Sequence, residues 1–199
     1  MATTGKGSLR SERLAARRAV PDEVRRAECD QLCSHLLAVV GRARTVAAYV
    51  PIRTEPGCPD MLEVLDELCE TVLLPLVDTG PAGQHLPLRW GRYVPGQLHR
   101  ARFGLLEPAG PALPAAAVAR AQVVLVPALA VDRRGVRLGR GGGFYDRSLP
   151  LCATGTRLVA VVRDGDILDE LPDEPHDVPM THALSPGGGL IPLHGGSST

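Results

Sequence analysis

The sequence has almost no lysine, few aromatic residues and no long apolar run, and these shortages exclude several classes of protein. Its 22 Lys+Arg balance its 22 Asp+Glu, which argues against a protein that binds mainly nucleic-acid phosphates, because such proteins need a basic surface. No apolar run approaches the roughly 20 residues that span a bilayer, and residues 1–18 lack the apolar core of a secretory signal. We therefore expect a cytoplasmic protein with neither nucleic acid nor membrane as a partner.

Lysine is so scarce that its one occurrence requires an explanation. Arginine supplies 21 of the 22 basic residues, and Lys6 is the only lysine among the 199 residues. Abundant Ala, Gly and Pro accompany this bias, which is typical of a GC-rich coding sequence. Chance near a chain terminus and a chemical requirement for lysine at this position both remain open.

The five cysteines are an odd number and include no C-x-x-C pair. An odd count fits a reducing compartment better than a disulfide framework, and the missing pair argues against a structural zinc site. Cys29 and Cys33 share one face of an expected helix, whereas the others are scattered. We expect reduced thiols that pack as small apolar side chains.

Apolar patterning predicts alternating helices and strands. Helical patterning covers residues 9–41 and 59–68, with a short helix near Tyr145, and strands are expected at 45–50, 72–77, 86–90, 122–126 and 157–162. The best strands are continuous apolar runs, which is typical of a mostly parallel sheet with helices on both faces. We expect a single three-layer α/β domain over residues 1–185. The Gly/Pro/Ser-rich residues 186–199 predict a disordered tail.

The segment VDRRGVRLGRGGGFYDR at residues 131–147 carries the densest candidate chemistry. It follows the strongest predicted strand, and ligands bind at the carboxyl ends of strands in open α/β sheets. Four glycines leave backbone N–H groups free to face an anion: Gly139, Gly141, Gly142 and Gly143. Arg137 and Arg140 suit phosphate oxygens, and Asp146 is a candidate magnesium ligand. These features favour a nucleotide-phosphate site, although a glycine-rich turn with incidental arginines remains the alternative, because no dinucleotide or Walker pattern is present.

Several motifs in this order resemble those of the 5-formyltetrahydrofolate cyclo-ligases, also called methenyltetrahydrofolate synthetases. The most specific is RLGRGGGFYD at residues 137–146. The others are KGSLR at 6–10, the strand 49–55 that ends in Glu55, FGLLEP at 103–108, VPALAVD at 126–132 and LPDEPHD at 171–177. The resemblance covers nearly everything from Lys6 to Ser185, and it implies a sugar-isomerase/CoA-transferase-like form of the three-layer fold.

This resemblance implies an ATP-dependent ligase that cyclises 5-formyltetrahydrofolate to 5,10-methenyltetrahydrofolate and releases ADP and phosphate. ATP would be bound by Lys6, Arg10, Arg137, Gly139, Arg140, Gly141, Gly142, Gly143, Phe144 and Tyr145. Folate would be bound by Val50, Glu55, Phe144 and Tyr145. The resemblance assigns Mg²⁺ to Asp146 and Asp177, and catalysis to Arg140 and Tyr145. A monomer or a small homo-oligomer is expected.

The chemistry of the substrate fits these requirements, but two other functions remain open. An N-formyl oxygen is a poor leaving group, so ATP must phosphorylate it before N10 attacks the formyl carbon. Departures from the family motifs at Val131 and Thr181 leave open an ATP-dependent enzyme of the same fold with a different small-molecule substrate. A non-enzymatic folate- or nucleotide-binding regulator is the third possibility. The basic face of the first helix, which carries Arg10, Arg13, Arg17 and Arg18, is interpreted as solvated.

Overall fold

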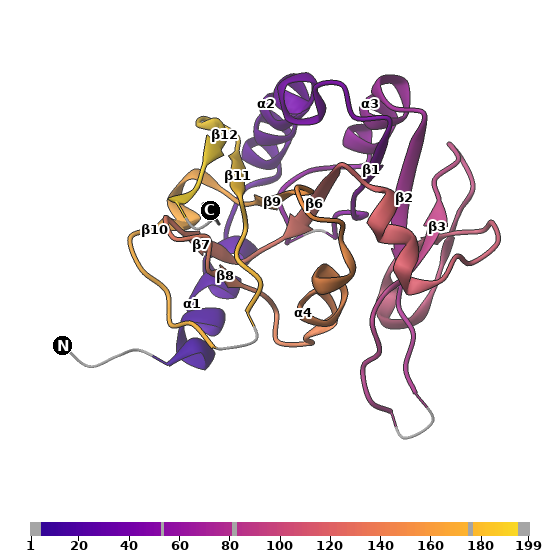
Figure 1. The fold of residues 1–199 in the computed structure, drawn as a ribbon. Helices are drawn as coiled ribbons and strands as arrows, with labels where there is room; N and C mark the ends of the chain where they lie inside the picture. Colours follow the sequence, from indigo (N-terminus) through magenta and orange to yellow (C-terminus); the bar gives the residue numbers. More distant parts are fainter. Residues whose placement is uncertain (1–4, 53, 81–82, 175–176, 195–199) are drawn as a thin grey trace.

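A seven-stranded sheet forms the centre of the molecule (Figure 1) in the computed structural model, which describes residues 5–52, 54–80, 83–174 and 177–194. Its strand order is β12-β11-β9-β6-β1-β2-β3. The strands are β1 (Thr45–Ala47), β2 (Thr71–Leu76), β3 (Arg89–Arg92), β6 (Val123–Pro127), β9 (Arg157–Val161), β11 (His182–Ser185) and β12 (Gly189–Pro192). All neighbouring pairs from β11 to β2 are parallel, and only the edge strands β12 and β3 run antiparallel to their neighbours. The predicted mostly parallel α/β sheet is thus confirmed.

Strand β6 shows why the central strands are continuous apolar runs. Successive side chains of a strand point to opposite faces of the sheet. Val123 and Leu125 therefore pack into one hydrophobic cluster, while Val124 and Val126 pack into another on the opposite face. Because both faces are buried, no position along this strand favours a polar residue.

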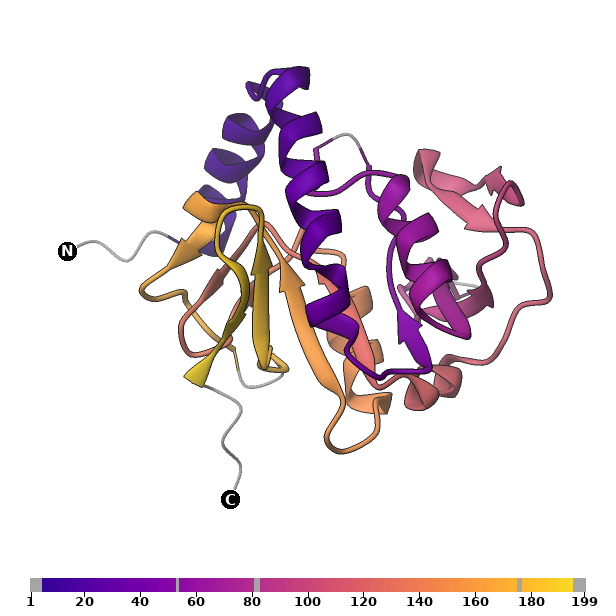
Figure 2. The same cartoon turned by 90° about the horizontal axis from the view of Figure 1, so that it is seen from above.

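Helices cover both faces of this sheet (Figure 1), and Figure 2 looks onto the face that α2 and α3 cover. On one face lie α2 (Asp22–Val40) and α3 (Asp60–Leu68), and α2 packs through the stripe Leu32, Leu36 and Val39. Figure 1 shows α4 (Phe144–Ser148) on the opposite side, where the 3-10 helices η2 (Ala115–Arg120) and η3 (Leu149–Leu151) also pack. None of the helices in the described ranges is long and apolar enough to cross a membrane.

A small second sheet brings the N-terminal helix to the glycine-rich segment. It consists of β7 (Ala130–Asp132), β8 (Arg137–Leu138) and β10 (Ile167–Leu168), with the 3-10 helix η4 (Asp164–Asp166) before β10. Helix α1 (Lys6–Arg18) packs Leu9 and Leu14 against it. The remaining elements, β4 (Leu98–Arg100), η1 (Arg102–Gly104) and β5 (Leu106–Pro108), form a hairpin beyond β3.

The C-terminal segment is more ordered than its composition predicts. β12 pairs with β11 over four residue pairs, and its Leu190 and Ile191 pack against the two main hydrophobic clusters. The Asp164 carboxylate accepts the N–H groups of Gly187 and Gly188 at 3.0 and 3.2 Å, which fixes the turn between the strands. The prediction of a disordered tail is therefore wrong for residues 186–194, whereas 195–199 lie outside the described residues.

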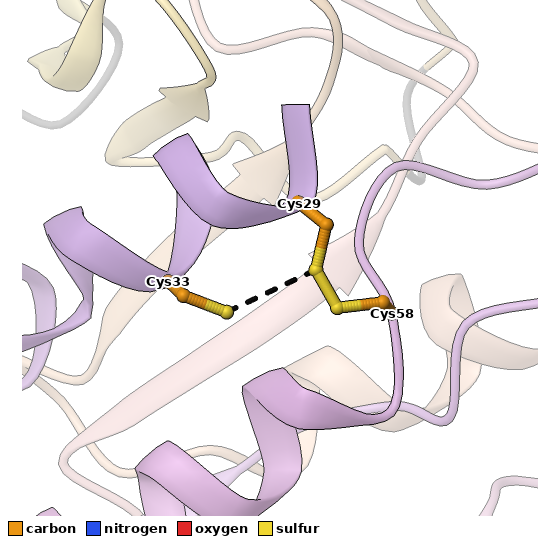
Figure 3. A group of neighbouring side chains, drawn as sticks. All are labelled: Cys29, Cys33 and Cys58. Atoms are coloured by element: carbon orange, nitrogen blue, oxygen red, sulfur yellow. Dashed lines mark hydrogen bonds between the residues drawn. A yellow bond between two sulfur atoms is a disulfide. The ribbon is translucent and has the colours of Figure 1, made fainter. Parts of the chain in front are cut away.

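Three cysteines meet between α2 and the segment before α3 (Figure 3). Cys29 and Cys58 form a disulfide, with Cα atoms 5.8 Å apart, and the sulfur of Cys33 lies 3.9 Å from that of Cys29. Cys33, Cys69 and Cys152 are free thiols. The expectation of five reduced cysteines is wrong at this pair, because packing across 29 residues of sequence leaves no local spacing signal.

Candidate active site

Two cavities meet at the glycine-rich loop between β8 and α4. One, of about 360 Å³, has mostly apolar walls, and we call it the apolar cavity. The other, of about 500 Å³, is lined mainly by charged residues and glycines, and we call it the charged cavity. Both are lined by Arg137, Gly139, the glycines at 141–143 and Asp146. The loop therefore forms a wall shared by the two cavities.

Glycine is required in this loop by backbone conformation. Gly141 and Gly143 have φ angles of +96° and +66°, which L-residues with a Cβ rarely adopt. The loop is also held from the side, because the His85 ring stacks on Phe144 with centroids 4.3 Å apart and its Nδ1 lies 2.6 Å from the Gly142 carbonyl oxygen. His85 was not identified from the sequence, since a single histidine in a loop gives no spacing signal.

The first turns of α1 reach the charged cavity. Lys6 Nζ lies 2.9 Å from Asp177 Oδ2 and 3.4 Å from Glu174 Oε1. Arg10 Nε donates to the carbonyl oxygen of Gly139 at 3.0 Å. The structure thus brings the two predicted N-terminal cations together with the glycine-rich loop, although more than 120 residues separate them in the sequence.

Both predicted magnesium ligands line the charged cavity, and each is paired with a cation. Asp146 Oδ1 accepts from Arg137 Nη2 at 2.5 Å, whereas Asp177 is the partner of Lys6. Arg137 also lies over the Tyr145 ring, 5.7 Å from its centroid. Carboxylate oxygens are the hard donors that Mg²⁺ prefers, so the donor chemistry of this cavity fits the ion.

A buried carboxylate lies in the wall of the apolar cavity. The side chain of Glu55 is only 11% exposed, its Oε2 accepts the Ile52 N–H at 3.1 Å, and Arg140 Nη1 lies 3.7 Å from Oε1. Burial raises the pKa of Glu55, an effect opposed by the Ile52 amide and the nearby arginines. Arg140 also donates to the Thr54 hydroxyl at 3.1 Å. Arg140 therefore lies beside the predicted folate residue Glu55 in this structure.

The predicted residues Val50, Phe144 and Tyr145 line the same apolar cavity. The Tyr145 hydroxyl is buried and has no hydrogen-bond partner among the described residues. Burial raises the pKa of Tyr145, and the Glu55 carboxylate adds to the shift, so this phenol stays protonated near neutral pH. It can donate a hydrogen bond to a ligand. Tyr49, by contrast, donates to the Pro56 carbonyl oxygen at 2.7 Å.

Arg17 contradicts the interpretation of the α1 arginines as a solvated face. Its side chain is 2% exposed and forms an ion pair of 2.8 Å with Asp166, whereas the neighbouring Arg18 is exposed. Arg17 lies on the same face of α1 as Arg10 and Leu14, at positions i, i+4 and i+7. That spacing, taken alone, was the signal that could have separated Arg17 from its exposed neighbours.

Glu107 is another wall residue to which the sequence assigned no role. Its Oε1 accepts the Val77 N–H at 2.9 Å just after β2, and the residue lines the apolar cavity. It lies within the FGLLEP motif at residues 103–108. The contact explains why a carboxylate is useful at this position.

Comparison with known proteins identifies the family. The family model described as "5-formyltetrahydrofolate cyclo-ligase family" matches residues 2–186. The chain belongs to the 5-formyltetrahydrofolate cyclo-ligase family. It is 51% identical over 193 residues to a 5-formyltetrahydrofolate cyclo-ligase of Mycolicibacterium smegmatis, covering 97% of this chain and 100% of that one. An Escherichia coli K12 cyclo-ligase is 29% identical over 173 residues, covering 85% and 94%.

Solved structures agree with the cyclo-ligase assignment. The NMR structure of Aquifex aeolicus 5,10-methenyltetrahydrofolate synthetase superposes with a TM-score of 0.76 at 26% identity, covering 98% of this chain and 95% of that one. A Mycoplasma pneumoniae synthetase superposes with a TM-score of 0.68 at 19% identity, covering 89% and 96%, and supports the fold. The predicted family and fold class are confirmed, and the chain is a ligase by family.

Proposed function

We propose that this cyclo-ligase family member converts 5-formyltetrahydrofolate and ATP to 5,10-methenyltetrahydrofolate, ADP and phosphate. The observation that carries the proposal is the shared wall formed by Gly139 and the glycines at 141–143. An apolar cavity with a buried carboxylate suits a flat heterocycle with N–H donors, and a cavity with several cations suits a polyphosphate. Ligands bound in the two cavities would bring the formyl oxygen and the terminal phosphate into contact beside this loop, where the cavities adjoin.

The nucleotide would occupy the charged cavity. Its phosphates would form ion pairs with Lys6, Arg10 and Arg137. The backbone N–H groups of residues 139–145 would donate further hydrogen bonds to the phosphate oxygens. Lys6 and Arg137 now neutralise Asp177 and Asp146. Binding would therefore exchange carboxylate partners for phosphate oxygens without leaving these cations unpaired.

Asp146 and Asp177 would then hold Mg²⁺ beside the phosphates. The ion, when bound, supplies charge neutralisation of the phosphoryl group in transfer. Two carboxylates that lose their arginine and lysine partners to phosphate need another cation. The exchange of partners therefore supports the assignment of these two residues to one site.

The folate would occupy the apolar cavity, with Val50, Phe144 and Tyr145 against the ring system. The Glu55 carboxylate would accept N–H groups of the pterin, and the free Tyr145 hydroxyl would donate to the formyl oxygen or to the phosphoryl group that it receives. We assign the partly exposed Arg140 to that phosphoryl group, because it lines the apolar cavity between two glycines that line both cavities. Positioning and charge neutralisation would supply the rate acceleration in this scheme.

The reaction would proceed in two displacements. The formyl oxygen attacks the terminal phosphorus, and the bond from that phosphorus to ADP breaks. N10 then attacks the formyl carbon, loses its proton to the released phosphate or to solvent, and the carbon–oxygen bond breaks. No protein nucleophile is needed, which agrees with a site built from cations, backbone donors and one buried carboxylate.

The test is the appearance of methenyltetrahydrofolate absorbance when purified protein meets 5-formyltetrahydrofolate, ATP and Mg²⁺. ADP release is measured in parallel with and without the folate. Product formation that requires all three components supports the proposal. Folded protein that forms no product contradicts it, and ADP release independent of folate would point to another small-molecule substrate.

A further inference from the structure

The guanidinium of Arg17 has one nitrogen without a partner in a buried place. Its Nε and Nη2 lie 3.3 and 2.8 Å from Asp166 Oδ2, and Nη2 also donates to the carbonyl oxygens of Ala128 at 2.7 Å and Leu129 at 3.2 Å. Nη1 has no hydrogen-bond partner among the described residues, although the side chain is 2% exposed. A buried donor on a charged group is costly when it has no acceptor.

This guanidinium lies at the wall of the apolar cavity. Arg17 lines the cavity, and so do Ala128 and Leu129, whose carbonyl groups hold its Nη2. Asp166 and these carbonyls fix the plane of the group. A ligand in the cavity can therefore supply a hydrogen-bond acceptor for Nη1. Because the guanidinium is already fixed, it loses little conformational freedom on binding.

Glu55 provides the complementary group in the same cavity. Arg17, Glu55 and Tyr49 line this cavity together, and the positive charge of Arg17 opposes the rise in pKa that burial causes at Glu55 and Tyr49. A carboxylate accepts hydrogen bonds and a guanidinium only donates them. The two groups match a ligand edge on which an N–H group stands next to a carbonyl oxygen.

The pterin has one edge that matches this pair. Arg17 and Glu55 line the apolar cavity, but neither is among the described residues that line the charged cavity. N3–H and the C4 carbonyl form the edge on which an N–H group stands next to a carbonyl oxygen, so it suits an acceptor carboxylate beside a donor guanidinium. The C4 carbonyl is peri to N5, so anchoring this edge also fixes the direction of the N5 formyl group.

We propose that Arg17 is a positioning and specificity residue whose Nη1 donates to the pterin C4 carbonyl oxygen, while Glu55 accepts the adjacent N3–H. This inference rests on the proposed function, because it takes 5-formyltetrahydrofolate as the ligand. Two bonds to adjacent atoms of one edge fix the ring in its plane. The ring orientation then presents the formyl oxygen to the shared wall.

The test compares Arg17→Lys with the control Arg13→Lys. A lysine at residue 17 keeps a cation beside Asp166 but removes the Nη1 donor. Arg13 also contacts this region, with Nη1 3.4 Å from Asp166 Oδ1 and 3.0 Å from the Gly165 carbonyl oxygen, yet it lines neither cavity. Calorimetric titration with 5-formyltetrahydrofolate gives Kd, and steady-state assays give the two KM values.

Arg17→Lys should raise the folate Kd and KM by roughly 10- to 150-fold, the range for one hydrogen bond from a charged donor. Its KM for ATP should be unchanged, and Arg13→Lys should stay within about twofold of wild type for folate. An unchanged folate Kd in folded Arg17→Lys overturns the inference. Wild-type protein that binds no folate overturns the proposed function as well.

A ligand change on the wild-type protein tests both proposed contacts without a variant. In the 4-amino analogue of 5-formyltetrahydrofolate, N–H donors replace the carbonyl oxygen that would face Arg17 Nη1, and N3 loses the hydrogen that would face Glu55. Wild-type protein should bind this analogue at least roughly 10-fold more weakly than the 4-oxo compound. Equal affinity for the two compounds overturns the inference, whether or not Arg17→Lys folds.

Discussion

Replacement of Lys6 is the most informative test of the nucleotide site. The ammonium is 13% exposed and lies 2.9 Å from Asp177 and 3.4 Å from Glu174, at the first residue of α1. In Lys6→Met the apolar stem is kept and the charge is lost. Removal of one charged hydrogen bond to a phosphate costs about 1.5 to 3 kcal/mol, which corresponds to an increase of roughly 10- to 150-fold in the KM for ATP.

Lys6→Arg separates charge from shape at the same position. An arginine keeps the charge, but its planar fork needs more room than a compact ammonium between two carboxylates. We expect a smaller increase in the KM for ATP, of roughly threefold to tenfold, because the charge is retained. Steady-state kinetics at saturating folate measure this value, and the KM for folate should not change.

The control for both variants is Arg18→Met, which removes an exposed cation from the last turn of the same helix. Its KM for ATP should stay within about twofold of wild type. If Lys6→Met and the control behave alike, the single lysine is a coincidence of composition and the phosphate assignment of Lys6 is refuted.

Three further predictions test the metal site, the buried carboxylate and the disulfide. Asp146→Ala should lower kcat by at least roughly 100-fold while folate Kd measured by calorimetry stays near wild type, and unchanged turnover would contradict the magnesium assignment. Glu55→Gln should raise Tm at pH 7 to 8, because burial raises the folded-state pKa of Glu55 and ionisation then costs stability. This advantage should fade as the pH falls toward 4.5, the ordinary value of the group, and an advantage equal at pH 4 and pH 8 would contradict the burial argument. Cys58→Ala should lower the free energy of unfolding by about 3 to 4 kcal/mol in denaturant titrations, from the entropy of a loop closed across 29 residues. Dithiothreitol should destabilise the wild type to the same level and leave the variant unaffected.

Local patterns predicted the sheet well, because burial on two faces leaves a direct mark on the sequence. The apolar run of β6 and the helical stripe of α2 each show in the local sequence which side chains are buried, whichever distant partners bury them. The tail was misassigned because glycine and proline counts do not distinguish a hairpin turn from disorder. Here the distant Asp164 holds the turn between β11 and β12.

At the site, the sequence predicted which residues line the cavities better than it predicted which residues they pair with. Asp146 and Asp177 were predicted from motifs, and the structure places both in the charged cavity. The pairing of Asp177 with Lys6 depends on how α1 docks, and the pairing of Asp146 with Arg137 depends on how the glycine-rich loop places α4 beside β8; no local pattern encodes either contact. The contact between Arg140 and Thr54 joins residues 86 apart in sequence and likewise had no signal in the loop motif.

The charge balance of the cavity bears on which form of the nucleotide it would accept. Its lining contains four cations, Lys6, Arg10, Arg137 and Arg147, and three carboxylates, Asp146, Glu174 and Asp177. A fully charged triphosphate alone would add its negative charge beside these carboxylates and be repelled by them, whereas a triphosphate that arrives with Mg²⁺ brings a cation for the carboxylates and oxygens for the lysine and arginines. The near-neutral cavity is thus better matched to the magnesium complex than to free ATP. The zero net charge of the whole chain, which argued against a nucleic-acid function, has a local counterpart at the site, where the proposed recognition of the nucleotide would depend on exchanging paired charges and not on an excess of positive charge.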